Sequence, residues 1–364
     1  MIMKTSTNQA YSFDDVLIVP QYSDVESRSN CSTEVQLPFM QLLRIPVFAS
    51  NMDTICGIKM AVKMRKLGGV GIIHRYMKPS ATHNLIHAWF HETRRNSDYD
   101  VLSDIHDGGG LPSEPLLTLA VGSIKNDKQR IDVVLDAVRE GKPINICIDL
   151  AHGDSKHMRD TLEYIHRGPK KRGAIIAGNV CTYEAAARLF DFGANVVKVG
   201  VGGGSACTTR IKTGCGYPQL AAIAECSEAG PVIADGGIRY YGDAAKAMAA
   251  GAEAVMIGGM LAGTDCTPAW QQKRVGKDME FRGMASRRAR EACDGFHANA
   301  EGVSTQVITK AKGSTETVVE NLMEGIRSAM SYSGCSTLEE FKLKARLIHV
   351  TESVISENRP HIKD

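Results

Sequence analysis

Apolar runs separated by helical stretches recur eight times along this chain. Each run is continuous rather than alternating, which is typical of parallel strands covered on both faces. The stretches between them, such as 183–192, 218–229 and 241–250, are rich in alanine and other good helix formers. The predicted strands span residues 45–52, 69–74, 116–122, 144–149, 174–180, 194–201, 231–237 and 254–259.

Eight strand–helix units in succession predict an α/β fold, a (β/α)₈ TIM barrel. A doubly wound sheet is the alternative, but eight units of this size favour closure. In such barrels the chemistry lies at the carboxyl ends of the strands. Here those ends carry polar and glycine-rich residues: Asn51, Asp53, His74, Arg75, Asp149, Asn179, the loop 202–217, Asp235, Gly236, Gly237, Gly258 and Gly259.

The loop 202–217 follows the sixth predicted strand and displays one cysteine, Cys207, between glycines. Thr208, Thr209 and Arg210 follow it and supply donors that could orient a ligand and lower the pKa of the thiol. A loop of this kind is a candidate site of covalent catalysis. The alternative is a flexible surface loop with an incidental cysteine.

Glycine pairs follow the seventh and eighth strands, where barrels commonly hold a phosphate on backbone N–H groups. Gly236 and Gly237 form the first pair, and Gly258 and Gly259 the second. Asp235, just before the first pair, could bind ribose hydroxyls. Its alternative role is to cap the following helix.

Composition limits the classes of function. With 43% hydrophobic and 23% charged residues the chain is globular, and a net charge of +2 favours neither a nucleic-acid surface nor a membrane anchor. No apolar run approaches the length of a spanning helix and the first nine residues are polar, so we expect a cytoplasmic protein. The ten cysteines show no C-x-x-C or pairing rhythm and indicate neither a disulfide framework nor a zinc site.

We expect a single catalytic domain over residues 1–364. An N-terminal arm covers 1–44, a long flap about 265–315 follows the eighth strand, and a C-terminal segment covers 316–364. Long loops at the catalytic rim are typically lids. Residues 91–115 read as an irregular loop, with no inserted regulatory domain.

Several motifs, taken in order, resemble the inosine-monophosphate dehydrogenase and guanosine-monophosphate reductase superfamily. The resemblance runs from Phe13-Asp-Asp-Val-Leu17 to Arg346-Leu-Ile-His-Val-Thr351. The motifs that carry it are Ala49-Ser-Asn-Met-Asp-Thr54, Ala177-Gly-Asn-Val180, Gly204-Ser-Ala-Cys-Thr-Thr-Arg210, Thr213-Gly-Cys-Gly-Tyr-Pro-Gln-Leu220, Asp235-Gly-Gly237, Gly258-Gly-Met-Leu-Ala-Gly263 and Arg282-Gly-Met284.

Details of these motifs look more like the reductase branch than the dehydrogenase branch. Asn51, Tyr217 and the run 258–263 are similar to the reductase, and 91–115 is too short for the regulatory repeats that the dehydrogenase commonly carries. The dehydrogenase hydrolyses its intermediate with an Arg-Tyr pair in the flap. This flap has no such pair and instead has Glu301-Gly302, similar to the reductase.

The resemblance implies NADPH-dependent reductive deamination of GMP to IMP through a covalent thioimidate on Cys207. Thr209 and Glu301 look like the acid/base pair, although Glu301 could also be a solvated flap charge. The implied substrate contacts are Asp235, Gly236, Gly237, Gly258, Gly259, Gly283, Met284, Ala285 and Gly302. The implied cofactor contacts are Ser27, Arg28, Arg75, Asp149, Leu150 and Ala151. Relatives also bind a monovalent cation, K⁺, which implies contacts at Gly202, Gly204, Cys207 and Arg210.

The resemblance further implies a homotetramer. Two departures stand out: His152 replaces the usual Asn of the reductase, and Arg75 replaces a Lys, which conserves the charge but not the geometry. Two alternatives stay open, an IMP dehydrogenase without regulatory repeats and a catalytically silent nucleotide-binding barrel.

Overall fold

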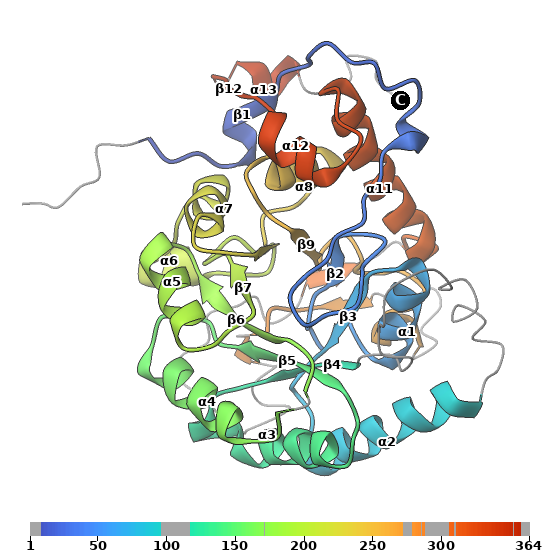
Figure 1. Ribbon diagram of the computed structural model, residues 1–364, viewed down its shortest axis with the longest axis vertical. Coiled ribbons are helices and arrows are strands. Elements are labelled where there is room, and N and C mark those ends of the chain that lie inside the picture. The colour runs from blue at the N-terminus through green and yellow to red at the C-terminus, as the bar shows by residue number, and fades with distance from the viewer. Residues whose placement is uncertain are drawn as a thin grey trace, which may run out of the picture.

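The computed structural model describes residues 9–95, 117–170, 172–271, 279–284, 286–287, 306–308, 311–351 and 353–357. Eight parallel strands close into a barrel in chain order, from β2 round to β9, which pairs back with β2 (Figure 1). This confirms the predicted (β/α)₈ fold. The barrel strands are β2 (Val47–Ala49), β3 (Val70–Ile73), β4 (Leu117–Val121), β5 (Ile144–Asp149), β6 (Ile175–Val180), β7 (Val196–Val199), β8 (Val232–Asp235) and β9 (Ala254–Ile257).

Helices surround the barrel, and α5, α7 and α8 lie close to the alanine-rich stretches 183–192, 218–229 and 241–250 that predict them. Their bounds are α1 (Ile58–Leu67), α2 (Pro79–Arg95), α3 (Ile124–Arg139), α4 (Lys156–Arg167), α5 (Tyr183–Asp191), α6 (Thr209–Thr213), α7 (Gln219–Ser227), α8 (Tyr241–Ala249), α9 (Pro268–Gln271), α11 (Thr315–Tyr332), α12 (Leu338–Lys344) and α13 (Val354–Glu357).

The strands are buried on both faces because successive side chains enter two different cores. On β6, Ile175 and Ala177 pack against the helices, whereas Ile176 between them faces the barrel interior. On β7, Val197 and Val199 face the helices and Val196 faces the interior. The same alternation points Lys198 inward.

Two short antiparallel pairs lie outside the barrel, and the apolar pattern predicts neither. In the N-terminal arm, β1 (Val16–Ile18) pairs with β12 (Leu347–His349), so these two segments, far apart in the sequence, lie side by side near α8 and α12 (Figure 1). In the flap region, β10 (Met279–Phe281) pairs with β11 (Gln306–Ile308). Strands of three residues are too short to show a period, and their pairing depends on distant segments.

One local prediction is wrong. Residues 91–95 were expected to begin an irregular loop, but α2 continues through Arg95. Glu and Arg are good helix formers, and the segment is the last turn of a helix whose earlier turns are packed on the barrel. Residues 96–116 lie outside the described part of the chain.

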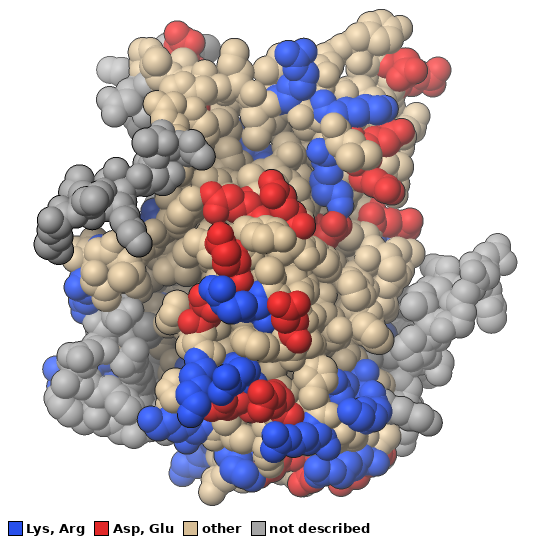
Figure 2. Space-filling model, turned by 60° about the vertical axis from the view of Figure 1, so that its left-hand side comes forward, with Lys and Arg blue, Asp and Glu red and all other residues tan. Residues whose placement is uncertain are grey.

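Charged side chains of both signs lie close together on the face that Figure 2 shows. On α4, for example, Arg159 pairs with Asp160 and with Glu163. No helix among the described residues is both long and apolar enough to span a membrane.

Candidate active site

A cavity of about 940 Å³ opens at the carboxyl ends of the barrel strands. Its volume is near the upper end of the range for ligand pockets, about 300–1,000 Å³. Of the predicted site residues, it is lined by Cys207, Thr209, Arg210, Gly202, Gly204, Asp235, Gly236, Gly237, Gly258, Gly259, Gly283, Met284, Arg75, Asp149, Leu150 and Ala151. These residues come from five strand ends (β3, β5, β7, β8 and β9) and from the flap base, and they converge on one space.

Cys207 and Thr209 lie together in the wall of this cavity. The thiol of Cys207 donates to the hydroxyl oxygen of Thr209 over 3.2 Å. Cys207 is half-buried, and it precedes the short helix α6, which begins at Thr209. A nucleophile and a hydroxyl at this separation can act on the same atom of a bound ligand.

Arg210 fastens the loop that carries Cys207. Its guanidinium donates to the backbone carbonyl of Val201, over 3.4 Å, and to that of Tyr217. The side chain passes so close to Gly202, at φ +77°, that a Cβ there would lie 2.5 Å from its Cγ. The donors of Arg210 therefore hold the two ends of the loop together.

A buried lysine, which sequence reasoning missed, lies beneath the loop. Lys198 is 1% exposed, and its Nζ lies 2.9 Å from Asp149 Oδ1 and 3.3 Å from Asp235 Oδ2. Asn179 also donates to Asp235 Oδ2, over 2.8 Å. The signal was present in the sequence, because a lysine stands in the middle of an otherwise apolar strand.

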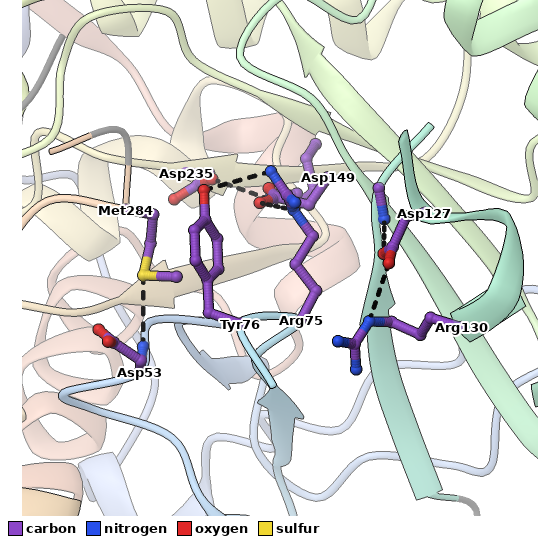
Figure 3. A network of polar contacts seen from close by, with 10 residues as sticks. Asp53, Arg75, Tyr76, Asp127, Arg130, Asp149, Asp235 and Met284 are labelled. Carbon is purple, nitrogen blue, oxygen red and sulfur yellow. Dashed lines mark hydrogen bonds and ion pairs between the residues drawn. The ribbon is translucent and has the colours of Figure 1, made fainter. Parts of the chain in front are cut away.

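Arg75 approaches the same network from β3, and Figure 3 shows its guanidinium directed toward both Asp149 and Tyr76. Its Nε lies 3.9 Å from Asp149 Oδ2, and its Nη2 donates to the Tyr76 hydroxyl over 3.3 Å. The guanidinium also stacks over the Tyr76 ring, 4.6 Å from the centroid. Burial works against ionisation of Asp149, but Lys198 and Arg75 outweigh it and hold the pKa of Asp149 below its ordinary value.

The base of the flap is tied to the loop after β2. Arg282, which leads into Gly283 and Met284, forms an ion pair with Asp53, with Nε 3.1 Å from Oδ2. The backbone N–H of Asp53 also points to the sulfur of Met284, 3.3 Å away (Figure 3). These contacts bring Gly283 and Met284 to the cavity wall.

Gln219 is a second cavity residue that sequence reasoning passed over. It is 3% exposed, and its Nε2 donates to the carbonyl of Val199 over 2.9 Å. Its Oε1 is buried without a hydrogen-bond partner among the described residues. A buried acceptor of this kind is costly unless a ligand or water completes it.

The IMP dehydrogenase / GMP reductase domain model matches residues 10–361. The chain belongs to this family. An inosine-5'-monophosphate dehydrogenase from Cryptosporidium parvum is 36% identical, with 96% of this chain and 94% of that protein covered. A GMP reductase from Shewanella halifaxensis is 34% identical, with 96% and 97% covered, and GMP reductase 2 of the mouse is 34% identical, with 94% of each covered.

A solved structure with the same fold is a GMP reductase from Trypanosoma brucei in complex with guanosine 5'-monophosphate. It superposes with a TM-score of 0.84 at 26% identity and covers 99% of both chains. Both branches of the family thus include proteins that this chain matches along nearly their whole length. The absence of a regulatory insert therefore does not separate the branches.

Some residues expected at the family's site are not on the cavity wall. Ser27 caps the 3₁₀ turn η2 (Arg28–Asn30), and Arg28 donates to Ser328 of α11 over 3.2 Å. Neither residue lines the cavity. Ala285, Glu301 and Gly302 lie outside the described residues.

The part of the chain that the structure describes holds no group of three or more His, Cys, Asp or Glu placed for a metal ion. The predicted K⁺ site would use backbone carbonyls of the loop instead. One of these, the carbonyl of Gly204, accepts the N–H of Cys207 over 2.9 Å. Occupancy by K⁺ stays a prediction.

Proposed function

We propose that this protein catalyses the NADPH-dependent reductive deamination of GMP to IMP and ammonia. The observation that carries the chemistry is the Cys207–Thr209 pair in the wall of a cavity that Asp235 and two glycine pairs also line. The choice of branch rests on the flap sequence, which has Glu301-Gly302 and no Arg-Tyr pair. The GMP reductases among its relatives support it.

The reaction begins at Sγ of Cys207. The thiolate forms a bond to C2 of the purine, the bond from C2 to the exocyclic nitrogen breaks, and the nitrogen leaves as ammonia after taking up a proton. NADPH, when bound, supplies the hydride that C2 then receives. The C2–S bond finally breaks, which releases IMP and returns the thiolate. A thiolate suits both steps because it is a strong nucleophile and a good leaving group.

Thr209 and Glu301 handle the proton in this proposal. The hydroxyl of Thr209 lies within hydrogen-bond reach of the reacting sulfur. A hydroxyl is too weak an acid to protonate an amine alone, so a carboxylate such as Glu301 must act with it. Closure of the flap would keep out water, which would otherwise convert the thioimidate to XMP.

The nucleotide occupies the side of the cavity lined by the glycine pairs. Gly236, Gly237, Gly258 and Gly259 bind the phosphate through backbone N–H groups. Gly283, Met284, Ala285 and Gly302 of the flap region are further substrate contacts. Asp235 accepts from the ribose hydroxyls. Its alternative role as a helix cap is not supported, because Tyr240 occupies the N-cap of α8.

We assign the cofactor to the part of the cavity lined by Arg75, Asp149, Leu150 and Ala151 together with Tyr76. A fixed carboxylate can accept from ribose hydroxyls, and the neighbouring apolar side chain of Leu150 can pack against a ring. Ser27 and Arg28 could contribute only from a neighbouring subunit of the homotetramer, because within this chain they do not line the cavity. We place the enzyme in the cytoplasm.

An IMP dehydrogenase is the second candidate, favoured by the 36% identity to the dehydrogenase of Cryptosporidium parvum. The same cysteine would add to C2 of IMP, NAD would accept the hydride from C2, and water would then hydrolyse the thioimidate to XMP and release the cysteine. A catalytically silent nucleotide-binding barrel is less well supported, because Cys207, Thr209 and Glu301 are all present.

One assay separates these candidates. The wild-type protein is given GMP with NADPH, or IMP with NAD, and reduced nicotinamide is followed by its absorbance. We expect loss of NADPH and release of ammonia in the first mixture only. Formation of NADH and XMP in the second would establish the dehydrogenase, and binding of GMP without turnover in either would establish the silent barrel. Glu301→Gln tests the acid: full deamination by this variant would contradict its role.

A further inference from the structure

Lys198 points into the barrel interior, and the residues on the neighbouring strands make room for its side chain. In the sheet register, Asp149 of β5 stands beside Gly178 of β6, and Gly178 stands beside Lys198 of β7. A Cβ on Gly178 would lie 2.6 Å from Cβ of Lys198. The missing side chain at Gly178 therefore lets Lys198 and Asp149 meet across the intervening strand.

The charge of Lys198 is balanced within the barrel interior. Burial alone would lower the pKa of the ammonium group, but Asp149 and Asp235 outweigh burial and raise it, so Lys198 stays protonated. The other titratable group facing it is Cys147, and burial raises the pKa of that thiol to about 12, which leaves it neutral. One cation thus faces two carboxylates, with Arg75 beyond Asp149.

Lys198 contacts one oxygen of each carboxylate. Asp235 Oδ2 receives both Lys198 and Asn179, while no hydrogen bond to Oδ1 is recorded among the described residues. Asp149 Oδ1 receives Lys198, and Oδ2 is directed toward Arg75. Asp235 belongs to the nucleotide side of the cavity and Asp149 to the cofactor side.

We propose that Lys198 is the positioning residue shared by the two halves of the site, holding Asp235 for the nucleotide and Asp149 for the cofactor in one arrangement. The identities of the two ligands rest on the proposed function. The distinguishing consequence is that one substitution, at a residue placed to touch neither reacting atom, weakens both ligands together.

The test measures GMP and NADPH binding separately by calorimetry in Lys198→Met, Asp235→Asn and Asp149→Asn. We expect Asp235→Asn to weaken GMP alone and Asp149→Asn to weaken NADPH alone. Lys198→Met should weaken both, each by roughly tenfold or more, the scale of a lost hydrogen bond to a charged group. Binding of both ligands with wild-type affinity by Lys198→Met would overturn the proposal.

A matched control distinguishes positioning from general stability. Lys342 also forms a partly buried ion pair, with Glu253 over 2.6 Å, but it does not line the cavity. Lys342→Met should lower the melting temperature without changing either affinity. If Lys198→Met behaved in the same way, Lys198 would be a stability residue only.

The pH profile gives a second readout. Lys198 helps to hold the pKa of Asp149 below its ordinary value, so its removal raises that pKa. Asp149 then gains its proton at a higher pH, and the acid limb of kcat/KM for NADPH should move upward in Lys198→Met. An unmoved acid limb would count against the proposal.

Two further measurements keep the outcomes separable. If Lys198→Met does not fold, the double variant Lys198→Met/Asp149→Asn replaces it. This variant removes one buried carboxylate together with the cation, so it should fold. It should still bind GMP more weakly than the single variant Asp149→Asn does. If the wild type binds IMP and NAD but not GMP, the proposed function fails, and the same variants test Lys198 on IMP and NAD.

Discussion

The loop 202–217 and the charged network beneath it border the same cavity but are held in different ways. In the loop, residues from Arg210 to Gly216 are exposed, and Arg210 holds the two ends through backbone carbonyls. In the network, Lys198 is 1% exposed, and its partners project from β5 and β8. The loop is therefore held mainly at its two ends, whereas every charged group of the network is held by a partner inside the barrel.

This difference suits two tasks. The group that forms and breaks bonds, Sγ of Cys207, stands on the loop, whose position depends on the contacts of Arg210. The groups that hold the ligands work best when they are fixed before binding. The comparison teaches that, in this site, bond making belongs to the loop and ligand binding to the strands, and substitutions can test that division.

The largest expected effect is at Cys207. Cys207→Ala removes the nucleophile, so kcat for GMP should fall by at least about a thousandfold. The network is untouched, so the affinity for GMP measured by calorimetry should stay within a few-fold of the wild type. Turnover within tenfold of the wild type would show that no covalent step occurs at this residue.

Asp235→Asn tests the network side. The substitution keeps the shape of the side chain but removes the charge that Lys198 and Asn179 orient. We expect KM for GMP to rise roughly ten- to hundredfold, the scale of a hydrogen bond to a charged group, while KM for NADPH changes little. An equal rise for both ligands would mean that the two halves of the site are not separate.

The sequence predicted the loop 202–217 better than it predicted the charged network. Cys207 and Thr209 are neighbours in the chain, so their contact is local and follows from the loop itself. The strand ends could be placed because a barrel brings all of them to one rim. These parts of the fold and site follow from period and topology.

The contacts of the network could not be predicted from any single strand of the sequence. The contact between Lys198 and Asp149 depends on register across β6 and on the absence of a side chain at Gly178. Likewise, the pairing of Arg282 with Asp53 joins residues that are distant in the chain. Long-range pairings of this kind are decided by tertiary packing, not by local pattern.

Arg210→Met tests the fastening of the loop. It removes the donors to the carbonyls of Val201 and Tyr217 and keeps most of the apolar stem. The loop should then sample positions away from C2, and kcat should fall by roughly tenfold because small misplacements of a nucleophile are costly. Arg167→Met, at an exposed arginine of α4 that does not line the cavity, is the control and should leave kcat unchanged.

The smallest expected effect is at the amino ends of the barrel strands, away from both the loop and the charged network. Glu253 directly precedes β9, and its carboxylate pairs with Lys342 of α12, both side chains being partly buried. Residues at the amino ends of barrel strands contribute to stability rather than to chemistry. Lys342→Met should lower the free energy of unfolding, measured with urea, by about 1 kcal/mol, with kcat and both KM values unchanged. A change in kcat here would mean that the site responds to general loosening of the barrel, and the effects at Arg210 and Lys198 could then no longer be assigned to the loop and the network.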